Sequence, residues 1–143
     1  MKNLFNDSLG INIKQYICRI IMILVTGALG QIGTELVLAL QEKYGKDSII
    51  ASDLEEPENY HCKFEKCDIR DIETYEKINY ENKIEIVYHL AAILSAVGEK
   101  NPELCHDVNY NGLENVLKPP KNITRNYSAL ALLQFSDLMY LKK

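Results

Sequence analysis

Segments typical of strands and segments typical of helices follow one another along the chain. Four short runs have the composition of buried or half-buried strands, at residues 20–26, 48–52, 63–67 and 85–90. Apolar residues recur at helical spacing in the segments between and after them, at 31–44, 71–82 and 102–117. Such alternation predicts a parallel sheet with right-handed crossovers. The pattern therefore predicts an α/β fold, a Rossmann-type doubly wound sheet with strand order 3-2-1-4.

The first predicted strand runs directly into a glycine-rich turn, Gly27-Ala28-Leu29-Gly30-Gln31-Ile32-Gly33. Gly27 permits a sharp turn, and Gly30 lets the backbone come close to a pyrophosphate. Gly33 lets the following helix pack closely on the sheet. The N-terminus of that helix offers free N–H groups and a partial positive charge to phosphates. This order of elements predicts a dinucleotide site, and a tight turn that binds nothing is the alternative.

An acidic residue, Asp53, ends the second predicted strand 20 residues after Gly33. A carboxylate at this place accepts hydrogen bonds from the ribose hydroxyls of an adenosine and repels a 2′-phosphate. We therefore expect the cofactor to be NAD rather than NADP. Small residues, Ala91 and Ala92, end the fourth predicted strand. They would let a ligand approach the backbone closely.

The pattern changes after residue 117. Pro119 and Pro120 end regular structure, and residues 118–125 show no strand alternation. The fifth strand of the sheet is therefore expected to be missing, which would leave the fourth as an edge. A helix is predicted from Tyr127 to Leu141, with apolar residues along one face.

Charge divides the chain in the same way. The 143 residues carry a formal net charge of −4. Residues 1–21 have three bases and one acid, residues 22–117 have eight and eighteen, and residues 118–143 have five and one. We predict an N-terminal extension (1–19), an NAD-binding half (20–117) and a divergent basic tail (118–143). A basic end can contact nucleic acid or membrane, but the tail is better explained as sequence foreign to the domain, so neither partner is expected.

Cysteine usage and hydropathy indicate an intracellular, cytoplasmic protein. The four cysteines form no Cys-x-x-Cys pair and are expected to be reduced thiols. The spacing of His61, Cys62 and Cys67 fits no common zinc site, so no metal is expected. No apolar run has the 18 or more residues of a membrane helix. A mitochondrial targeting segment is one interpretation of residues 1–19, and a true start at Met22 is the alternative.

Residues 22–117 resemble the extended short-chain dehydrogenase/reductases of the NAD-dependent epimerase/dehydratase type, and within these the L-threonine 3-dehydrogenases. The resemblance rests on segments 23–36, 51–53, 68–70, 89–96, 99–102, 108–109 and 112–117. The run from His89 to Leu117 is its more specific part. The resemblance implies that this sheet is incomplete and lacks strands five to seven and the C-terminal substrate region.

The resemblance also implies a set of contacts with NAD. The pyrophosphate, ribose, adenine and groove positions would be Gly27, Gly30, Gln31, Ile32, Gly33, Asp53, Asp68, Ile69, Leu90, Ala91, Ala92 and Asn109. Ser95 would face the substrate. Other interpretations stay open, since Asp68 could cap a helix, Asn109 could bond a nearby loop, and Ser95 could cap a turn. His89 is expected to be a core histidine.

Chemistry in this family needs a Tyr with a Lys four residues later and an upstream Ser or Thr, because the Lys lowers the pKa of the Tyr. No Tyr in this sequence has a Lys at that spacing, so no catalytic residue is assigned. The resemblance implies the NAD-binding portion of an enzyme that oxidises L-threonine to 2-amino-3-oxobutanoate, inactive by itself. A fragment of an NAD-dependent sugar epimerase or dehydratase, and a non-catalytic NAD-binding interaction module, are the alternatives. In the full-length family we expect a small-molecule substrate and a homodimer.

Overall fold

A computed structural model describes residues 21–94, 98–119 and 128–131. Its centre is a five-stranded sheet in which every neighbouring pair is parallel. The strands are β1 (Ile23–Thr26), β2 (Ile49–Asp53), β3 (Lys63–Lys66), β4 (Ile86–His89) and β5 (Ser128–Ala131). They lie in the order β3-β2-β1-β4-β5. The Rossmann-type α/β fold and the order of the first four strands are confirmed.

The fifth strand corrects two predictions. β5 pairs with β4 in parallel, from Ser128 opposite Ile86 to Ala131 opposite His89, so β4 is internal and a fifth strand is present. Residues 128–131 are not helical, and the rest of the helix predicted to Leu141 lies outside the described residues. The local sequence Ser-Ala-Leu-Ala lacks the branched and aromatic side chains that favour strands. Pairing with β4 therefore decides its conformation.

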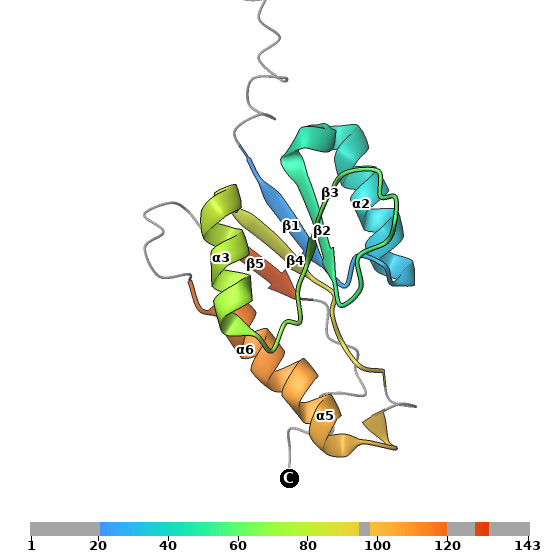
Figure 1. Cartoon of the computed structure of the whole chain (residues 1–143), viewed down its shortest axis with the longest axis vertical. Coiled ribbons are helices and arrows are strands. Elements are labelled where there is room, and N and C mark those ends of the chain that lie inside the picture. The colour runs from blue at the N-terminus through green and yellow to red at the C-terminus, as the bar shows by residue number, and fades with distance from the viewer. Residues whose placement is uncertain (1–20, 95–97, 120–127, 132–143) are drawn as a thin grey trace, which may run out of the picture.

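Helices cover both faces of the sheet (Figure 1). One face carries α2 (Gln31–Tyr44), which is followed by the short 3₁₀ turn η1 (Lys46–Ser48). The other face carries α3 (Ile72–Asn82) and a helical run made of α5 (Pro102–His106), η2 (Asp107–Asn111) and α6 (Gly112–Leu117). The run matches the single helix predicted over 102–117, except that its middle turn, η2, is π-helical. Such turns are rare and often occur at functional sites.

Each face of the sheet has its own apolar core. Between the sheet and α2 lie Ile23, Val25, Ala28, Val37, Leu40, Ile49 and Ala51. Between the sheet and the α3 and α6 side lie Leu24, Ile50, Cys67, Ile69, Tyr75, Ile78, Ile84, Val87 and Val116. Alternate residues of β1 and β2 supply both clusters, because successive side chains of a strand point to opposite faces. This explains why both strands read as continuous apolar runs.

Side-chain caps fix where the helices of the second face begin. The Asp71 carboxylate accepts hydrogen bonds from the backbone N–H groups of Glu73 and Thr74 at the start of α3. The Asn101 side chain accepts one from the N–H of Leu104, and Pro102 occupies the first turn of α5. The predicted cap at Asn101 is confirmed. The alternative in which Asp68 caps a helix is wrong, because Asp71 takes that place.

His89 makes the stability of the fold sensitive to acid. His89 is 3% exposed at the end of β4, and its Nδ1 lies 2.7 Å from the Thr26 hydroxyl of the neighbouring strand. Burial lowers the pKa of His89 to about 4, below the 6.5 of an unfolded histidine. The unfolded chain therefore binds a proton first as the pH falls, so stability is full above pH 6.5 and declines toward pH 4. When the pH falls from 7 to 5, we expect protonation of His89 in the unfolded chain to lower the free energy of unfolding by about 2 kcal/mol.

The measurement is urea unfolding of the chain and of a His89→Gln variant at both pH values. The variant should lose about 2 kcal/mol less stability than the parent on acidification. Equal losses in the two proteins would show that another group causes the acid sensitivity.

Candidate functional site

A cavity of about 480 Å³ opens where the carboxyl ends of the parallel strands meet. The glycine turn, the end of β2, the segment after β3, the segment after β4 and the helical run all contribute to its wall. Its lining residues are Thr26, Gly27, Leu29, Gly30, Ser52, Asp53, Leu54, Cys67, Asp68, Ile69, Arg70, Leu90, Ala91, Ala92, Ile93, Leu104 and Val108. The cavity thus collects residues from across the described chain at the place where α/β sheets bind ligands.

The glycine turn needs its glycines for steric reasons. Gly27 has φ of +71°, and a Cβ there would lie 2.6 Å from the Leu90 carbonyl carbon and the Ala91 nitrogen. A Cβ at Gly33 would lie 2.1 Å from the Gly27 carbonyl oxygen. At Gly30 the nearest atom is that same oxygen at 3.3 Å. Gly27 and Gly33 therefore allow the turn to exist, while Gly30 leaves the turn open toward the cavity.

The start of α2 suits an anion. Gly30 is its N-cap residue, no side chain caps the helix, and its first turn carries no acidic residue. N–H groups of the first helical turn point out of the N-terminus and add to the positive end of the helix dipole. A pyrophosphate fits this position, both in charge and in hydrogen-bonding capacity.

The Asp53 carboxylate at the end of β2 lies beside this turn. One oxygen accepts a hydrogen bond from the Leu29 N–H at 2.9 Å and the other from the Leu54 N–H at 2.8 Å. Asp53 thereby ties the glycine turn to the segment after β2. Each carboxylate oxygen can accept a second hydrogen bond, so Asp53 retains capacity for a ribose hydroxyl.

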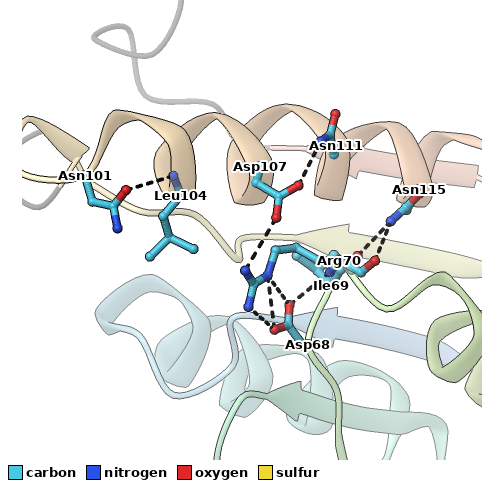
Figure 2. Close-up of polar contacts among 8 residues, drawn as sticks. All are labelled: Asp68, Ile69, Arg70, Asn101, Leu104, Asp107, Asn111 and Asn115. Carbon is cyan, nitrogen blue, oxygen red and sulfur yellow. Dashed lines mark hydrogen bonds and ion pairs between the residues drawn. The ribbon is translucent and has the colours of Figure 1, made fainter.

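The segment after β3 forms one end of the cavity. Asp68 accepts hydrogen bonds from both the backbone N–H and the guanidinium of Arg70 (Figure 2). These bonds to Arg70 hold the pKa of the Asp68 carboxyl below its usual range. Ile69 is 5% exposed and lines the cavity together with Leu104 and Val108 of the helical run. An apolar slot bordered by a carboxylate fits an adenine, which has two flat faces and an amino edge.

Asn109 acts on the cavity through another residue. Its side-chain oxygen accepts from the Ile93 N–H at 2.8 Å, and its Nδ2 donates to the Ile93 carbonyl at 2.9 Å. Asn109 does not line the cavity, whereas Ile93 does. The alternative in which Asn109 bonds a nearby loop describes what the structure shows. The π-helical turn η2 carries Asn109.

The structure brings most of the expected NAD contacts together. Gly27, Gly30, Asp53, Asp68, Ile69, Leu90, Ala91 and Ala92 all line the cavity. Gln31 and Ile32 are exposed at the start of α2, and Gly33 lies beneath the turn. Ser95 lies outside the described residues.

Sequence reasoning missed several lining residues. Leu104 and Val108 are one helical turn apart, which reads as an ordinary packing stripe. Arg70 follows the expected Asp68 by two residues, and this placement after a strand was the available signal. Leu54 has the same signal, because it directly follows Asp53.

In the part of the chain that the structure describes, no three His, Cys, Asp or Glu side chains gather in a way that could hold a metal ion. Among the same residues, no helix is long and apolar enough to cross a membrane. Burial, with the charges of Asp71 and Asp68, raises the pKa of the Cys67 thiol to about 12. Cys67 is therefore a packing residue and not a reactive thiol.

Residues 23–128 match the model of the NAD dependent epimerase/dehydratase family. The chain belongs to this family. The match extends beyond Leu117 as far as the first residue of β5, and NAD is the cofactor that family membership indicates. The glycine turn and the uncapped N-terminus of α2 fit the pyrophosphate of that cofactor. Asp53 fits its ribose, and the apolar part of the cavity beyond Asp53 fits its adenine.

Individual family members agree with this assignment. A curated epimerase/dehydratase of Staphylococcus haemolyticus is 46% identical over 100 residues, which are 67% of this chain and 31% of that protein. The solved structure of a monomeric L-threonine 3-dehydrogenase from a metagenome is 94% identical, with a TM-score of 0.66, over 66% of this chain and 31% of that one. A Thermus thermophilus UDP-glucose 4-epimerase in complex with NAD is 30% identical, with a TM-score of 0.59, over 66% and 32%. The chain spans about a third of the length of these relatives.

Proposed function

We propose that this chain is the NAD-binding portion of an L-threonine 3-dehydrogenase-like oxidoreductase. The observation that carries the proposal is the 94% identity to an L-threonine 3-dehydrogenase over 66% of the chain. The physical support is the cavity itself, whose glycine turn and Asp53 have the geometry that a dinucleotide needs.

In this proposal each part of the cavity holds one part of NAD. The N–H groups at the start of α2 bind the pyrophosphate, and Gly30 allows its close approach. Asp53 accepts from the ribose hydroxyls and disfavours a 2′-phosphate. Ile69, Leu104 and Val108 enclose the adenine. The bound NAD supplies the hydride acceptor for oxidation of the substrate hydroxyl.

The chain by itself is proposed to bind NAD without turnover. Proton abstraction in this family requires a Tyr whose pKa is lowered by a Lys four residues later, and the 143 residues contain no such pair. His89, although it lies near the cavity, is buried against Thr26 and has a lowered pKa. It serves packing rather than proton transfer.

The test has two parts. Calorimetric titration of the 143-residue chain should detect NAD binding, and incubation with NAD and L-threonine should produce no NADH. Threonine-dependent NADH formation would refute the lack of turnover, and failure to bind NAD would refute the nucleotide role.

A chimera tests whether the nucleotide half is competent. Residues 22–117 would replace the corresponding segment of the 94% identical dehydrogenase. We expect threonine oxidation at close to the rate of the parent enzyme. An inactive but folded and NAD-binding chimera would instead favour a nucleotide half adapted to another substrate.

The second candidate, a sugar epimerase-like protein, has its support in the likeness to the UDP-glucose 4-epimerase.

A further inference from the structure

The peptide unit that joins Ala28 to Leu29 in the glycine turn is held at both ends by side chains. Its carbonyl oxygen accepts hydrogen bonds from the Thr34 hydroxyl at 3.3 Å and from the Tyr60 hydroxyl at 3.4 Å. Its N–H donates to the Asp53 carboxylate at 2.9 Å. These three side chains come from α2, from the loop between β2 and β3, and from the end of β2. We refer to Thr34, Tyr60 and Asp53 as the peptide clamp.

The peptide clamp fixes which way this peptide unit faces. A trans peptide is planar, and its C=O and N–H groups point in opposite directions. The N–H points to Asp53, which lines the cavity, whereas the carbonyl points to Thr34 and Tyr60, which are not among the lining residues. If the peptide turned over, its carbonyl oxygen would face the Asp53 carboxylate and the cavity.

Tyr60 is the member of the clamp whose hydroxyl serves this carbonyl alone among the printed contacts of the two hydroxyls, since Thr34 also donates to the Gly30 carbonyl at 3.0 Å. The Tyr60 ring stacks on His61 with centroids 4.3 Å apart and meets the Phe64 ring edge-on at 5.2 Å. Burial raises the pKa of Tyr60, so the hydroxyl keeps its proton and remains a donor. The ring contacts therefore hold a hydroxyl donor against the turn.

We propose that Tyr60 is a positioning residue for the pyrophosphate part of the dinucleotide site, acting through the Ala28 carbonyl. The inference rests on the proposed NAD binding. Tyr60 keeps the carbonyl dipole of Ala28 turned away from the phosphates, and the N–H groups at the start of α2 then face the phosphates unopposed. A carbonyl oxygen turned toward a pyrophosphate would repel it, because both groups are acceptors and both carry negative charge.

The experiment compares NAD with adenosine, which has the base and the ribose but no pyrophosphate. Dissociation constants for both are measured by NMR chemical-shift titration, which extends to millimolar ligand, on the 143-residue chain and its variants. Tyr60→Phe removes the hydroxyl and keeps the ring. Thr34→Val removes the other hydroxyl on the same carbonyl, and a double variant removes both.

Tyr44→Phe is the matched control. Tyr44 packs against the same apolar core as Tyr60, and it is the last residue of α2, at the opposite end of the helix from the glycine turn. The substitution is chemically identical to Tyr60→Phe. Urea unfolding of every variant shows whether a loss of binding reflects a loss of folded protein.

We expect Tyr60→Phe to weaken NAD binding about threefold, which is the scale of one neutral hydrogen bond. The double variant should weaken it about tenfold, because the Ala28 carbonyl then loses both hydroxyl partners. Adenosine should bind these variants as it binds the parent, since Asp53 and the apolar part of the cavity are unchanged. Tyr44→Phe should leave both affinities unaltered.

Two results would overturn the proposal. The first is unchanged NAD affinity in both Tyr60→Phe and the double variant. The second is an equal loss of affinity for NAD and adenosine, which would indicate that Tyr60 supports the ribose site or the fold as a whole. Should Tyr60→Phe fail to fold, Thr34→Val decides the matter. A parent chain that does not bind NAD would refute the proposed function itself, and the role of Tyr60 with it.

Discussion

Replacement of Gly33 by alanine is expected to lower the free energy of unfolding by about 3 kcal/mol or more. The new Cβ would lie 2.1 Å from the Gly27 carbonyl oxygen and 2.8 Å from the Ala28 Cα. Both are backbone atoms of the glycine turn, so no side-chain rotation can relieve the overlap. Helix α2 would have to move away from β1, which would open the apolar core that contains Val37 and Leu40.

Gly30→Ala is the matched control for this prediction. Among the described residues, a Cβ at Gly30 has one neighbour within 4 Å, the Gly27 oxygen at 3.3 Å, and Gly30 has an ordinary negative φ of −69°. We expect this variant to lose about 1 kcal/mol of stability or less, mainly through the poorer N-cap. Its affinity for NAD should nevertheless fall about tenfold or more, because the methyl group occupies the approach to the pyrophosphate.

Urea unfolding and calorimetric NAD titration of both variants separate the two effects. Gly33→Ala should lose stability, while Gly30→Ala should lose binding and keep most of its stability. A stable Gly33→Ala protein would contradict the close packing of α2 on the turn. Normal NAD binding by Gly30→Ala would contradict the placement of the pyrophosphate.

Substitution of Asp53 by asparagine is expected to weaken NAD binding about tenfold. The amide has nearly the shape of the carboxylate, but it offers one acceptor oxygen where two now accept from the Leu29 and Leu54 N–H groups. Loss of the negative charge also removes repulsion of a 2′-phosphate. We therefore expect the preference for NAD over NADP to fall by about tenfold or more.

Glu55→Gln provides the control for charge alone. Glu55 is exposed two residues further along and does not line the cavity. Its substitution changes the net charge by the same amount and should leave both affinities nearly unaltered. If the two variants changed the NAD to NADP ratio equally, the selectivity would come from the general acidity of the central segment and not from Asp53.

Local sequence was a good guide wherever a short stretch of chain decides its own structure. The glycine turn, the strands β1 and β2 on either side of the turn and its helix, and the cap at Asn101 depend on neighbours within a few residues. All of them were predicted close to their observed bounds. β5 was missed because residues 128–131 have no strand pattern of their own. They become a strand only where β4 offers its edge for pairing.

The same distinction applies to the candidate site, where local sequence predicts some residues and distant contacts decide others. The spacing of Gly27, Gly30 and Asp53 predicts the roles proposed for them, because the strand, turn and helix that place them are continuous in the sequence. The link between Arg70 and Asp107 joins residues 37 positions apart. No local pattern predicts that these two side chains form an ion pair with each other.

The sequence alone thus determined the α/β fold, the order of its first four strands and the turn that suits a dinucleotide. These features follow from hydrophobic periodicity and from glycine sterics, which act over short distances along the chain. Only the tertiary structure decided the fifth strand, the hydrogen bonds of Asn109 to Ile93 and the ion pair between Arg70 and Asp107. These depend on which distant segments the parallel crossovers bring together, because hydrogen bonds and ion pairs form between neighbours in space.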